Sequence, residues 1–276
     1  MYLLNGESKH CIEFLDRGFQ YGDGLFETIE IVDGNPVFLN QHLQRLNLGC
    51  EKLLIPTPDI SILKQEAFQL AKNSDHAVLK LIVTRGSGGR GYRQPEVIHP
   101  TRLFSLHPYP SYSEKLTTQG INAFFCQTQL GISPSLAGIK HLNRLEQVLA
   151  RAEWSSADLH EGLMMNCHGH VVEGTMSNVF IVKDNCLYTP EITQSGVRGI
   201  LRDIIIQLAK EQQIPVIETV LSKEDVYKAD ELFITNSVIG IWPVKQLVEH
   251  TYNVGQVTHK LQALFLQFKK QTLDFL

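Results

Sequence analysis

Apolar and polar residues alternate in several short segments of the chain, a pattern typical of strands with one buried face. The clearest segment is 25–32 (LFETIEIV), which is followed by the turn residues 33–35 and a short return strand at 36–38. The same reasoning predicts further strands at 76–85, 102–107, 121–128, 162–166, 171–173, 178–182, 186–188, 216–220, 232–235 and 241–244. Successive strands joined by short turns favour antiparallel hairpins.

Helical spacing of apolar residues separates these strands. It predicts a helix capped by Asn40, a helix capped by Ser195 or Gly196, and a short helix after Ser222. The predicted helices lie at 40–53, 58–72, 142–155, 197–211, after Ser222, and at 257–270. Hairpins mixed with helices indicate an α+β fold rather than a strict βαβ alternation.

A length of 276 residues is enough for two domains. Segment 108–120 contains two prolines and has no apolar periodicity, which is typical of a linker. We predict an N-terminal α+β domain over 1–110, a linker over 111–120, and a C-terminal domain over 121–276.

Composition narrows the function classes. The net charge of −4 does not favour nucleic-acid binding. The five cysteines form no CxxC pair, which argues against a disulfide framework and the common zinc-ribbon sites, and we expect no metal. Neither a signal peptide nor an apolar stretch of membrane-spanning length is recognisable, so we expect a cytoplasmic protein without a membrane partner.

Segment 86–91 (GSGGRG) satisfies the G-x-G-x-x-G pattern of dinucleotide-binding folds. No helix is predicted after it, although such a helix is needed to hold a pyrophosphate. We therefore interpret it as a flexible loop over a pocket, in which Arg90 can meet a carboxylate. The alternative is a long surface hairpin with solvated arginines. Segment 167–170 (CHGH) is similarly interpreted as a turn rather than a metal site.

Lys140 is the first candidate for covalent chemistry. It lies in a segment of small and apolar residues, 136–141 (LAGIKH), just before a predicted helix. Such surroundings lower the pKa of a lysine and free the amine for Schiff-base chemistry. The alternative is an ordinary solvated lysine.

Three further segments suit an anionic, aromatic cofactor. Glu173, at the end of a strand, could pair with a ring nitrogen, or could simply be an edge-strand glutamate beside a turn. The segment 195–200 opens a helix whose free amides could bind a phosphate, or could only need a cap. Arg45, beside an apolar helix face, requires an anionic partner if it is partly buried, and otherwise forms a rim salt bridge.

In this order, these segments resemble the fold-type IV pyridoxal-phosphate enzymes, which include branched-chain and D-amino-acid aminotransferases and aminodeoxychorismate lyase. The similarity covers nearly the whole chain, from Asp16 to Val244. It rests on H-x-x-R-L at Arg45, K-x-x-N/x-R at 140–144, E-G-x-x-S-N at 173–178 and G-[VI]-x-R/G-I-x-R at 196–202. The resemblance implies two α/β domains with pyridoxal 5′-phosphate between them, the cofactor lysine in the C-terminal domain, and a homodimer.

The resemblance also implies roles for particular residues. Lys140 would carry the cofactor, Glu173 would hold the pyridinium nitrogen and Val197 would pack on the ring. The residues implied to bind the phosphate or to complete the cofactor site are Arg45, Ser177, Asn178, Ile200, Leu201, Asn236 and Ser237. The segment 234–238 (ITNSV) departs from the aminotransferases, which more often carry paired small residues with threonine at this turn.

Within the family the chain is most similar to the lyase branch. Segment 85–92 resembles the glycine–arginine loop of the lyases, and Thr28 stands where they carry a threonine. The resemblance implies conversion of 4-amino-4-deoxychorismate to 4-aminobenzoate and pyruvate in folate biosynthesis, with Lys140 and Thr28 catalytic. Residues expected to contact the substrate are Phe26, Arg90, Tyr92 and Tyr109. A D-amino-acid or branched-chain aminotransferase of the same fold is the alternative, and a non-catalytic ligand-binding relative is the third possibility.

Overall fold

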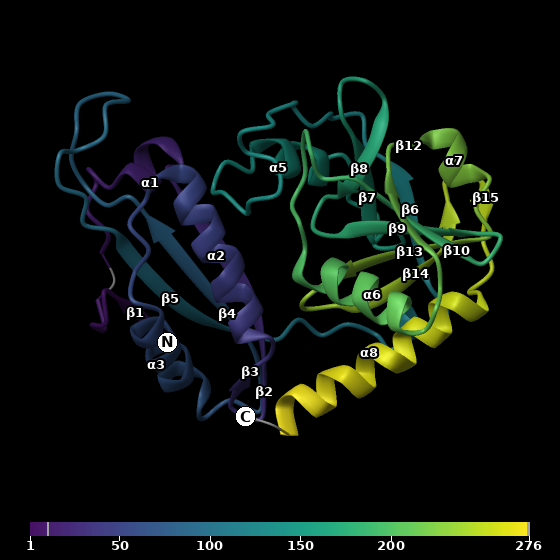
Figure 1. Ribbon diagram of the computed structural model, residues 1–276, viewed down its shortest axis with the longest axis horizontal. Coiled ribbons are helices and arrows are strands. Elements are labelled where there is room, and N and C mark those ends of the chain that lie inside the picture. The colour runs from purple at the N-terminus through teal and green to yellow at the C-terminus, as the bar shows by residue number, and fades with distance from the viewer. Residues whose placement is uncertain (10, 275–276) are drawn as a thin grey trace. The chain divides into compact units, whose positions relative to one another are not determined.

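The computed structural model describes residues 1–9 and 11–274, and these divide into two compact units (Figure 1). The first unit comprises Met1–Pro110, the segment Ile139–Asn143 and the chain from Thr272. The second comprises Ser111–Gly138 and Arg144–Gln271. Lys140 therefore belongs to the first unit, whereas the sequence prediction placed it in the C-terminal domain. The reason is backbone pairing: the Phe26 amide donates to the Lys140 carbonyl over 2.9 Å.

The first unit is built on a five-stranded antiparallel sheet in the order β1-β5-β4-β2-β3. In β2, alternate residues from Leu25 to Ile31 form a fully buried face, and α2 packs against this strand. The alternation predicted from the sequence is thereby confirmed. The strands are β1 (Tyr2–Leu4), β2 (Gly24–Val32), β3 (Asn35–Pro36), β4 (His76–Thr84) and β5 (Thr101–Pro108); the helices are α1 (Arg17–Tyr21), α2 (Leu39–Leu53) and α3 (Ile60–Ala71).

The second unit is built on a ten-stranded mixed sheet with the path β11-β10-β9-β13-β14-β6-β7-β8-β12, and β15 pairs with β14. Most pairs are antiparallel, while β6 runs parallel to both β7 and β14, and β10 runs parallel to β11. The strands are β6 (Ile121–Phe125), β7 (Glu161–Met165), β8 (His170–Gly174), β9 (Asn178–Lys183), β10 (Cys186–Pro190), β11 (Val216–Thr219), β12 (Leu221–Ser222), β13 (Glu231–Asn236), β14 (Gly240–Leu247) and β15 (His250–Thr251). The helices are α4 (Lys115–Thr118), α5 (Leu145–Arg151), α6 (Ile200–Glu211), α7 (Lys223–Tyr227) and α8 (Gln256–Asp274), of which α4 lies in the predicted linker.

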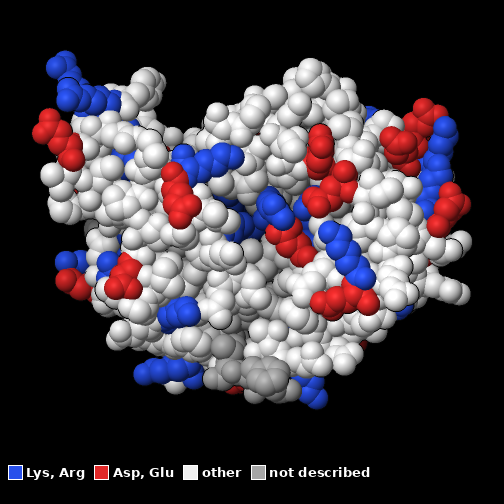
Figure 2. Space-filling model, in the orientation of Figure 1, with Lys and Arg blue, Asp and Glu red and all other residues white. Residues whose placement is uncertain are grey.

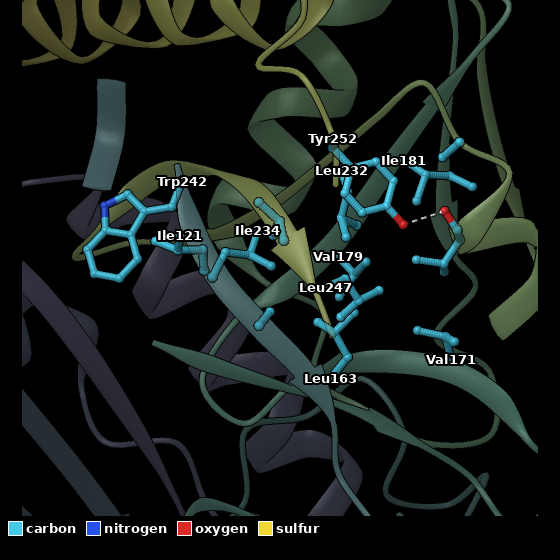
Figure 3. Close-up of a cluster of buried hydrophobic side chains, with 14 of the residues drawn as sticks. Ile121, Leu163, Val171, Val179, Ile181, Leu232, Ile234, Trp242, Leu247 and Tyr252 are labelled. Carbon is cyan, nitrogen blue, oxygen red and sulfur yellow. Dashed lines mark hydrogen bonds between the residues drawn. The ribbon is translucent and has the colours of Figure 1, made fainter. Parts of the chain in front are cut away.

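A large apolar cluster fills one side of this second sheet (Figure 3). Ile121, Leu163 and Ile234 are fully buried in it, and Trp242 closes one end. Tyr252 also lies in the cluster, where its hydroxyl donates to the Val226 carbonyl over 2.8 Å. Burying one leucine or isoleucine side chain stabilises a fold by about 1.5–3 kcal/mol. The cluster therefore fixes the strands that carry candidate site residues.

Three predicted helix starts are wrong, and the helix predicted over 142–155 begins only at Leu145. The helix after the first hairpin begins at Leu39, with Phe38 in the left-handed conformation as its cap, so Asn40 lies inside it. The helix predicted from residue 197 begins only at Ile200, with Gly199 as its cap, because residues 196–198 pair with Gly138. No described helix is long and apolar enough to cross a membrane. On the face in Figure 2, acidic and basic side chains are interspersed, in keeping with the small net charge.

Candidate active site

Lys140 is held at the start of β2 by main-chain pairing. The Phe26 amide donates to the Lys140 carbonyl, and the Leu142 amide donates to the Gly24 carbonyl over 3.0 Å. The Lys140 Nζ lies 4.4 Å from the centroid of the Phe26 ring. This half-buried amine is therefore fixed over an aromatic face, which favours a cation–π contact.

The face of β2 that carries Phe26 also carries Thr28, since successive even-numbered residues share one side of a strand. Lys80 of β4 stands directly opposite Thr28, and its Nζ lies 5.3 Å from the Phe26 centroid. Two amines thus lie near one aromatic ring, on the strand face that also carries the Thr28 hydroxyl. The sequence analysis missed Lys80, although a lysine inside the apolar run 76–85 (HAVLKLIVTR) was a visible signal.

The opposite face of β2 presents Glu27 to α2. Arg45 donates to both Glu27 carboxylate oxygens, with Nε at 2.8 Å, and His42 Nδ1 lies 2.6 Å from Oε2. Burial opposes ionisation of Glu27, but Arg45 and His42 lower its pKa to about 2. Burial lowers the pKa of His42, so the imidazole is neutral and donates its Nδ1 proton. The anionic partner that a partly buried Arg45 requires is therefore Glu27.

The glycine–arginine loop follows β4 without any helix between Thr84 and Thr101, so the rejection of a dinucleotide-binding motif is confirmed. Four of its glycines have positive φ angles. Arg17 fastens the loop, donating to the Gly91 carbonyl over 2.9 Å and to Asp23 over 2.9 Å. Arg90 and Tyr92 are exposed in this loop.

Tyr109 lies far from that loop. It stacks on His76 with ring centroids 3.5 Å apart, next to the pairing of Ala77 with Pro108. The loop leaves β4 at its other end, after Thr84. Thr84 is seven positions after Ala77 along the strand, a distance on the order of 20 Å. The first unit therefore does not bring Tyr109 together with Arg90 or Tyr92.

In the second unit, Glu173 ends β8 and is 5% exposed. One of its oxygens accepts the Val197 amide over 2.8 Å, and Gln147 donates to the other over 3.3 Å. The Asn178 side chain donates to the Val197 carbonyl over 2.8 Å. Glu173 thus binds the main-chain amide of Val197 and Asn178 binds its carbonyl, which together fix the position of its side chain.

The start of α6 offers main-chain amides for an anion. Gly199 caps the helix without a side-chain hydrogen bond, so the amides of its first turn, from Ile200 and Leu201, are not satisfied by a cap. A Cβ on Gly199 would lie 2.0 Å from Asn178 Oδ1, so only glycine allows this close approach. Thr235, opposite Asn178 in the sheet, has a fully buried hydroxyl with no partner among the described residues.

These features fit the phosphate group expected from the resemblance. Uncapped amides at a helix start attract a phosphate, and an unpaired buried hydroxyl next to them is unfavourable until a ligand satisfies it. Asn236 and Ser237 follow Thr235 at the end of β13. The Asn236 side chain is already engaged, since it donates to the Met176 carbonyl and accepts the Val238 and Ile239 amides.

Segment 167–170 forms a turn between β7 and β8. The Asn166 side chain accepts the amides of His168 and His170, and Gly169 has a φ of +76°. Over residues 1–9 and 11–274, no group of three or more histidine, cysteine, aspartate or glutamate side chains is placed to hold a metal ion. The interpretation of this segment as a turn is confirmed.

Comparisons with known proteins show the family to which the chain belongs. The amino-transferase class IV family matches residues 24–247. The chain is 34% identical to aminodeoxychorismate lyase of Vibrio harveyi over 95% of this chain and 98% of that one. It is also 36% identical to a Methanocaldococcus jannaschii protein provisionally named a branched-chain-amino-acid aminotransferase. This match covers 95% of this chain and 94% of that one.

A solved structure of 4-amino-4-deoxychorismate lyase from Pseudomonas aeruginosa superimposes with a TM-score of 0.94 at 44% identity, over 97% of this chain and 98% of that one. The α+β, fold-type IV architecture is thereby confirmed, and with it the cofactor. The chain belongs to the amino-transferase class IV family, and its cofactor is pyridoxal 5′-phosphate.

Proposed function

We propose that this protein is a lyase that converts 4-amino-4-deoxychorismate to 4-aminobenzoate and pyruvate, a step of folate biosynthesis. The observation that carries the proposal is that the Lys140 and Lys80 amines lie over the Phe26 ring, on the strand face that also carries Thr28. A base, a hydroxyl and a second cation suit a substrate that must lose a proton and a carboxylate-bearing leaving group. The similarity to lyases from two organisms supports the same activity.

The cofactor supplies an aromatic ring that accepts electrons from the reacting carbon. Lys140 Nζ carries the cofactor, and then removes the proton from C4 of the substrate ring. Glu173 holds a proton at the pyridinium nitrogen. Its burial and the hydrogen bond that it accepts from the Val197 amide keep its carboxylate in a fixed direction. The Thr28 hydroxyl relays the proton that Lys140 has taken from C4 to the leaving enolpyruvyl group, whose C3–O bond breaks; its release as pyruvate makes the ring aromatic and returns Lys140 to the neutral amine.

The remaining site residues orient the cofactor and the substrate. Val197 packs on the ring, while Lys80 holds one of the two substrate carboxylates as a point charge. Phe26, Arg90 and Tyr92 are proposed to contact the substrate, whereas Tyr109, which stacks on His76 at the other end of β4, lies outside this contact. The residues proposed to bind the phosphate or to complete the cofactor site are Ser177, Asn178, Ile200, Leu201, Asn236 and Ser237. Arg45 is proposed to bind the phosphate as well, while its guanidinium stays paired with Glu27.

The decisive experiment is release of pyruvate from 4-amino-4-deoxychorismate in the absence of any keto-acid acceptor. We expect stoichiometric pyruvate and 4-aminobenzoate, and no pyruvate would refute the proposal. Lys80→Met should raise the KM for this substrate by about tenfold, because a charge-assisted contact is worth about 1.5–3 kcal/mol. Lys64→Met on α3 is the matched control and should leave KM unchanged.

A branched-chain or D-amino-acid aminotransferase is the second candidate, favoured by the 36% identical relative from Methanocaldococcus jannaschii. It would use the same lysine and the same cofactor, but would need a keto acid to complete its cycle. Amino-group transfer from a simple amino acid to 2-oxoglutarate, without pyruvate release from 4-amino-4-deoxychorismate, would establish this function instead.

We also propose that the protein is a cytoplasmic homodimer. On α5, Leu145 is 76% exposed, and Val148 and Leu149 are each 61% exposed. Three large apolar side chains on one short helix are unusual on the surface of a monomer and suit a contact with a second copy. Light scattering of the purified protein tests this: a mass of one chain would refute the dimer.

A further inference from the structure

Glu161 is a buried carboxylate that the sequence analysis did not single out. It begins β7 and is 0% exposed. Its Oε1 accepts the Thr175 hydroxyl at 2.5 Å, the Thr175 amide at 3.0 Å and the Gly162 amide at 2.9 Å. Its Oε2 accepts the Ser177 hydroxyl at 2.7 Å and the Met176 amide at 3.3 Å. Four of these five donors come from the turn 175–177.

That turn connects two strands whose ends both serve the candidate site. Glu173 precedes it and Asn178 follows it, and each of them binds the main chain of Val197. From the other side, Asn236 donates to the Met176 carbonyl over 3.0 Å. The turn therefore hydrogen-bonds both to the Glu161 carboxylate and to the side-chain amide of Asn236. Its shape sets the spacing between Glu173 and Asn178.

The packing around Glu161 leaves the turn no room to adjust. A Cβ on Gly174 would lie 2.7 Å from Glu161 Oε2 and 2.3 Å from Ser177 Oγ. The single hydroxyl proton of Ser177 is donated to Glu161, so this side chain cannot also donate to a phosphate. Its contribution to the site must come from its hydroxyl lone pairs or its main chain.

We propose that Glu161 is a positioning residue for cofactor binding: it templates the turn 175–177 and thereby sets Glu173, Asn178 and the main chain around them. This inference rests on the proposed roles of Glu173 and Asn178. It does not depend on which reaction the enzyme catalyses, because it concerns binding of the cofactor rather than the fate of the substrate.

The test compares Glu161→Gln with Glu231→Gln. A glutamine places an NH2 donor against the hydroxyl donors of the turn, so the turn must change shape. Glu231 is a close match in the same unit: it is 8% exposed and accepts the Thr258 hydroxyl at 2.6 Å and two amides, from Val257 and Thr258. Its partners lie at the start of α8, away from the turn 175–177.

Two measurements are made on each purified variant: the Kd for pyridoxal 5′-phosphate, by titration of the apoenzyme, and the thermal unfolding midpoint of the apoenzyme. We expect both variants to lose thermal stability. Only Glu161→Gln should raise the Kd, by about tenfold or more. At saturating cofactor its kcat should stay below the wild-type value, because the changed turn also shifts Glu173, which holds the ring nitrogen protonated.

An equal Kd in the two variants, or a Kd that follows the unfolding midpoint in both, would overturn the proposal. If Glu161→Gln does not fold, Thr175→Val removes one donor while the carboxylate stays, and Thr258→Val is its control. A Kd raised by Thr175→Val alone supports the inference, and an unchanged Kd contradicts it. Wild-type protein that binds the cofactor but releases no pyruvate would refute the lyase reaction and leave this comparison valid.

Discussion

Replacing Glu27 by glutamine should strongly destabilise the first unit. Glu27 accepts two hydrogen bonds from Arg45 and one from His42, and its side chain is 1% exposed. Glutamine is nearly isosteric, but it cannot compensate the charge of the Arg45 guanidinium, which is only 12% exposed. The NH2 group of the glutamine would also point at an N–H donor of Arg45 or His42. The variant therefore removes an ion pair without creating a cavity.

The magnitude follows from the pKa of Glu27. A decrease from 4.5 to about 2 corresponds to about 3 kcal/mol of stability at neutral pH, at about 1.4 kcal/mol per unit. Removing one partner of a buried ion pair costs about 3–5 kcal/mol, which is consistent. Because the folded-state pKa is depressed, this stability is fully present above pH 4.5 and is lost as the pH falls toward 2.

The assay is urea unfolding of the wild-type apoenzyme and of Glu27→Gln between pH 7 and pH 3.5. The difference in unfolding free energy should be about 3 kcal/mol at pH 7 and should narrow by about 1.4 kcal/mol at pH 3.5. Glu51→Gln, on the exposed side of α2, is the control and should change stability by less than about 0.5 kcal/mol. A difference that does not depend on pH, or one below about 1 kcal/mol, would refute the assigned ion pair.

Three substitutions test the proposed chemistry. Lys140→Ala should abolish turnover, and borohydride should no longer trap the cofactor on the chain; covalent cofactor after reduction would contradict the role of Lys140. Glu173→Gln should keep the cofactor bound but cut turnover by orders of magnitude, because a neutral amide cannot hold the ring nitrogen protonated. The expected loss of transition-state stabilisation is several kcal/mol, about 3–4 at most. Near-full activity of this variant would exclude Glu173 from the mechanism. Thr28→Val should slow pyruvate release about tenfold, or ~1.4 kcal/mol, with an unchanged cofactor spectrum; an unchanged rate would make Thr28 an ordinary strand residue.

Local patterns predicted much of the fold. The alternation over 25–32 identifies β2 and its buried face, because one side of the strand packs against a helix and the other does not. The short helix after Ser222 was also predicted, and the structure shows the Ser222 side chain accepting the Asp225 amide in a capping box. Such features depend on a few neighbouring residues, and a single sequence contains them.

Non-local pairing could not be predicted in the same way. Lys140 joins the first unit because its main chain pairs with Phe26, and no local pattern contains that contact. The start of α6 is delayed because the Gly138 amide donates to Gly196 and its carbonyl accepts from Arg198. In both places hydrogen bonds to a distant segment overrule the local preference of the chain for a helix or a loop.

Glu27 and Glu161 show why the charge of a buried residue cannot be inferred from its position alone. Both are fully buried, and burial raises the pKa of each carboxyl group. Glu27 faces the cation Arg45, so its pKa falls to about 2 and it is ionised at neutral pH. Glu161 has only hydroxyl and amide donors, which do not outweigh burial, so its pKa stays raised. Glu27 therefore acts through charge, whereas Glu161 acts through the number and direction of the hydrogen bonds it accepts. Conservative substitutions should separate the two, because glutamine removes the charge at Glu27 but reverses the direction of a hydrogen bond at Glu161.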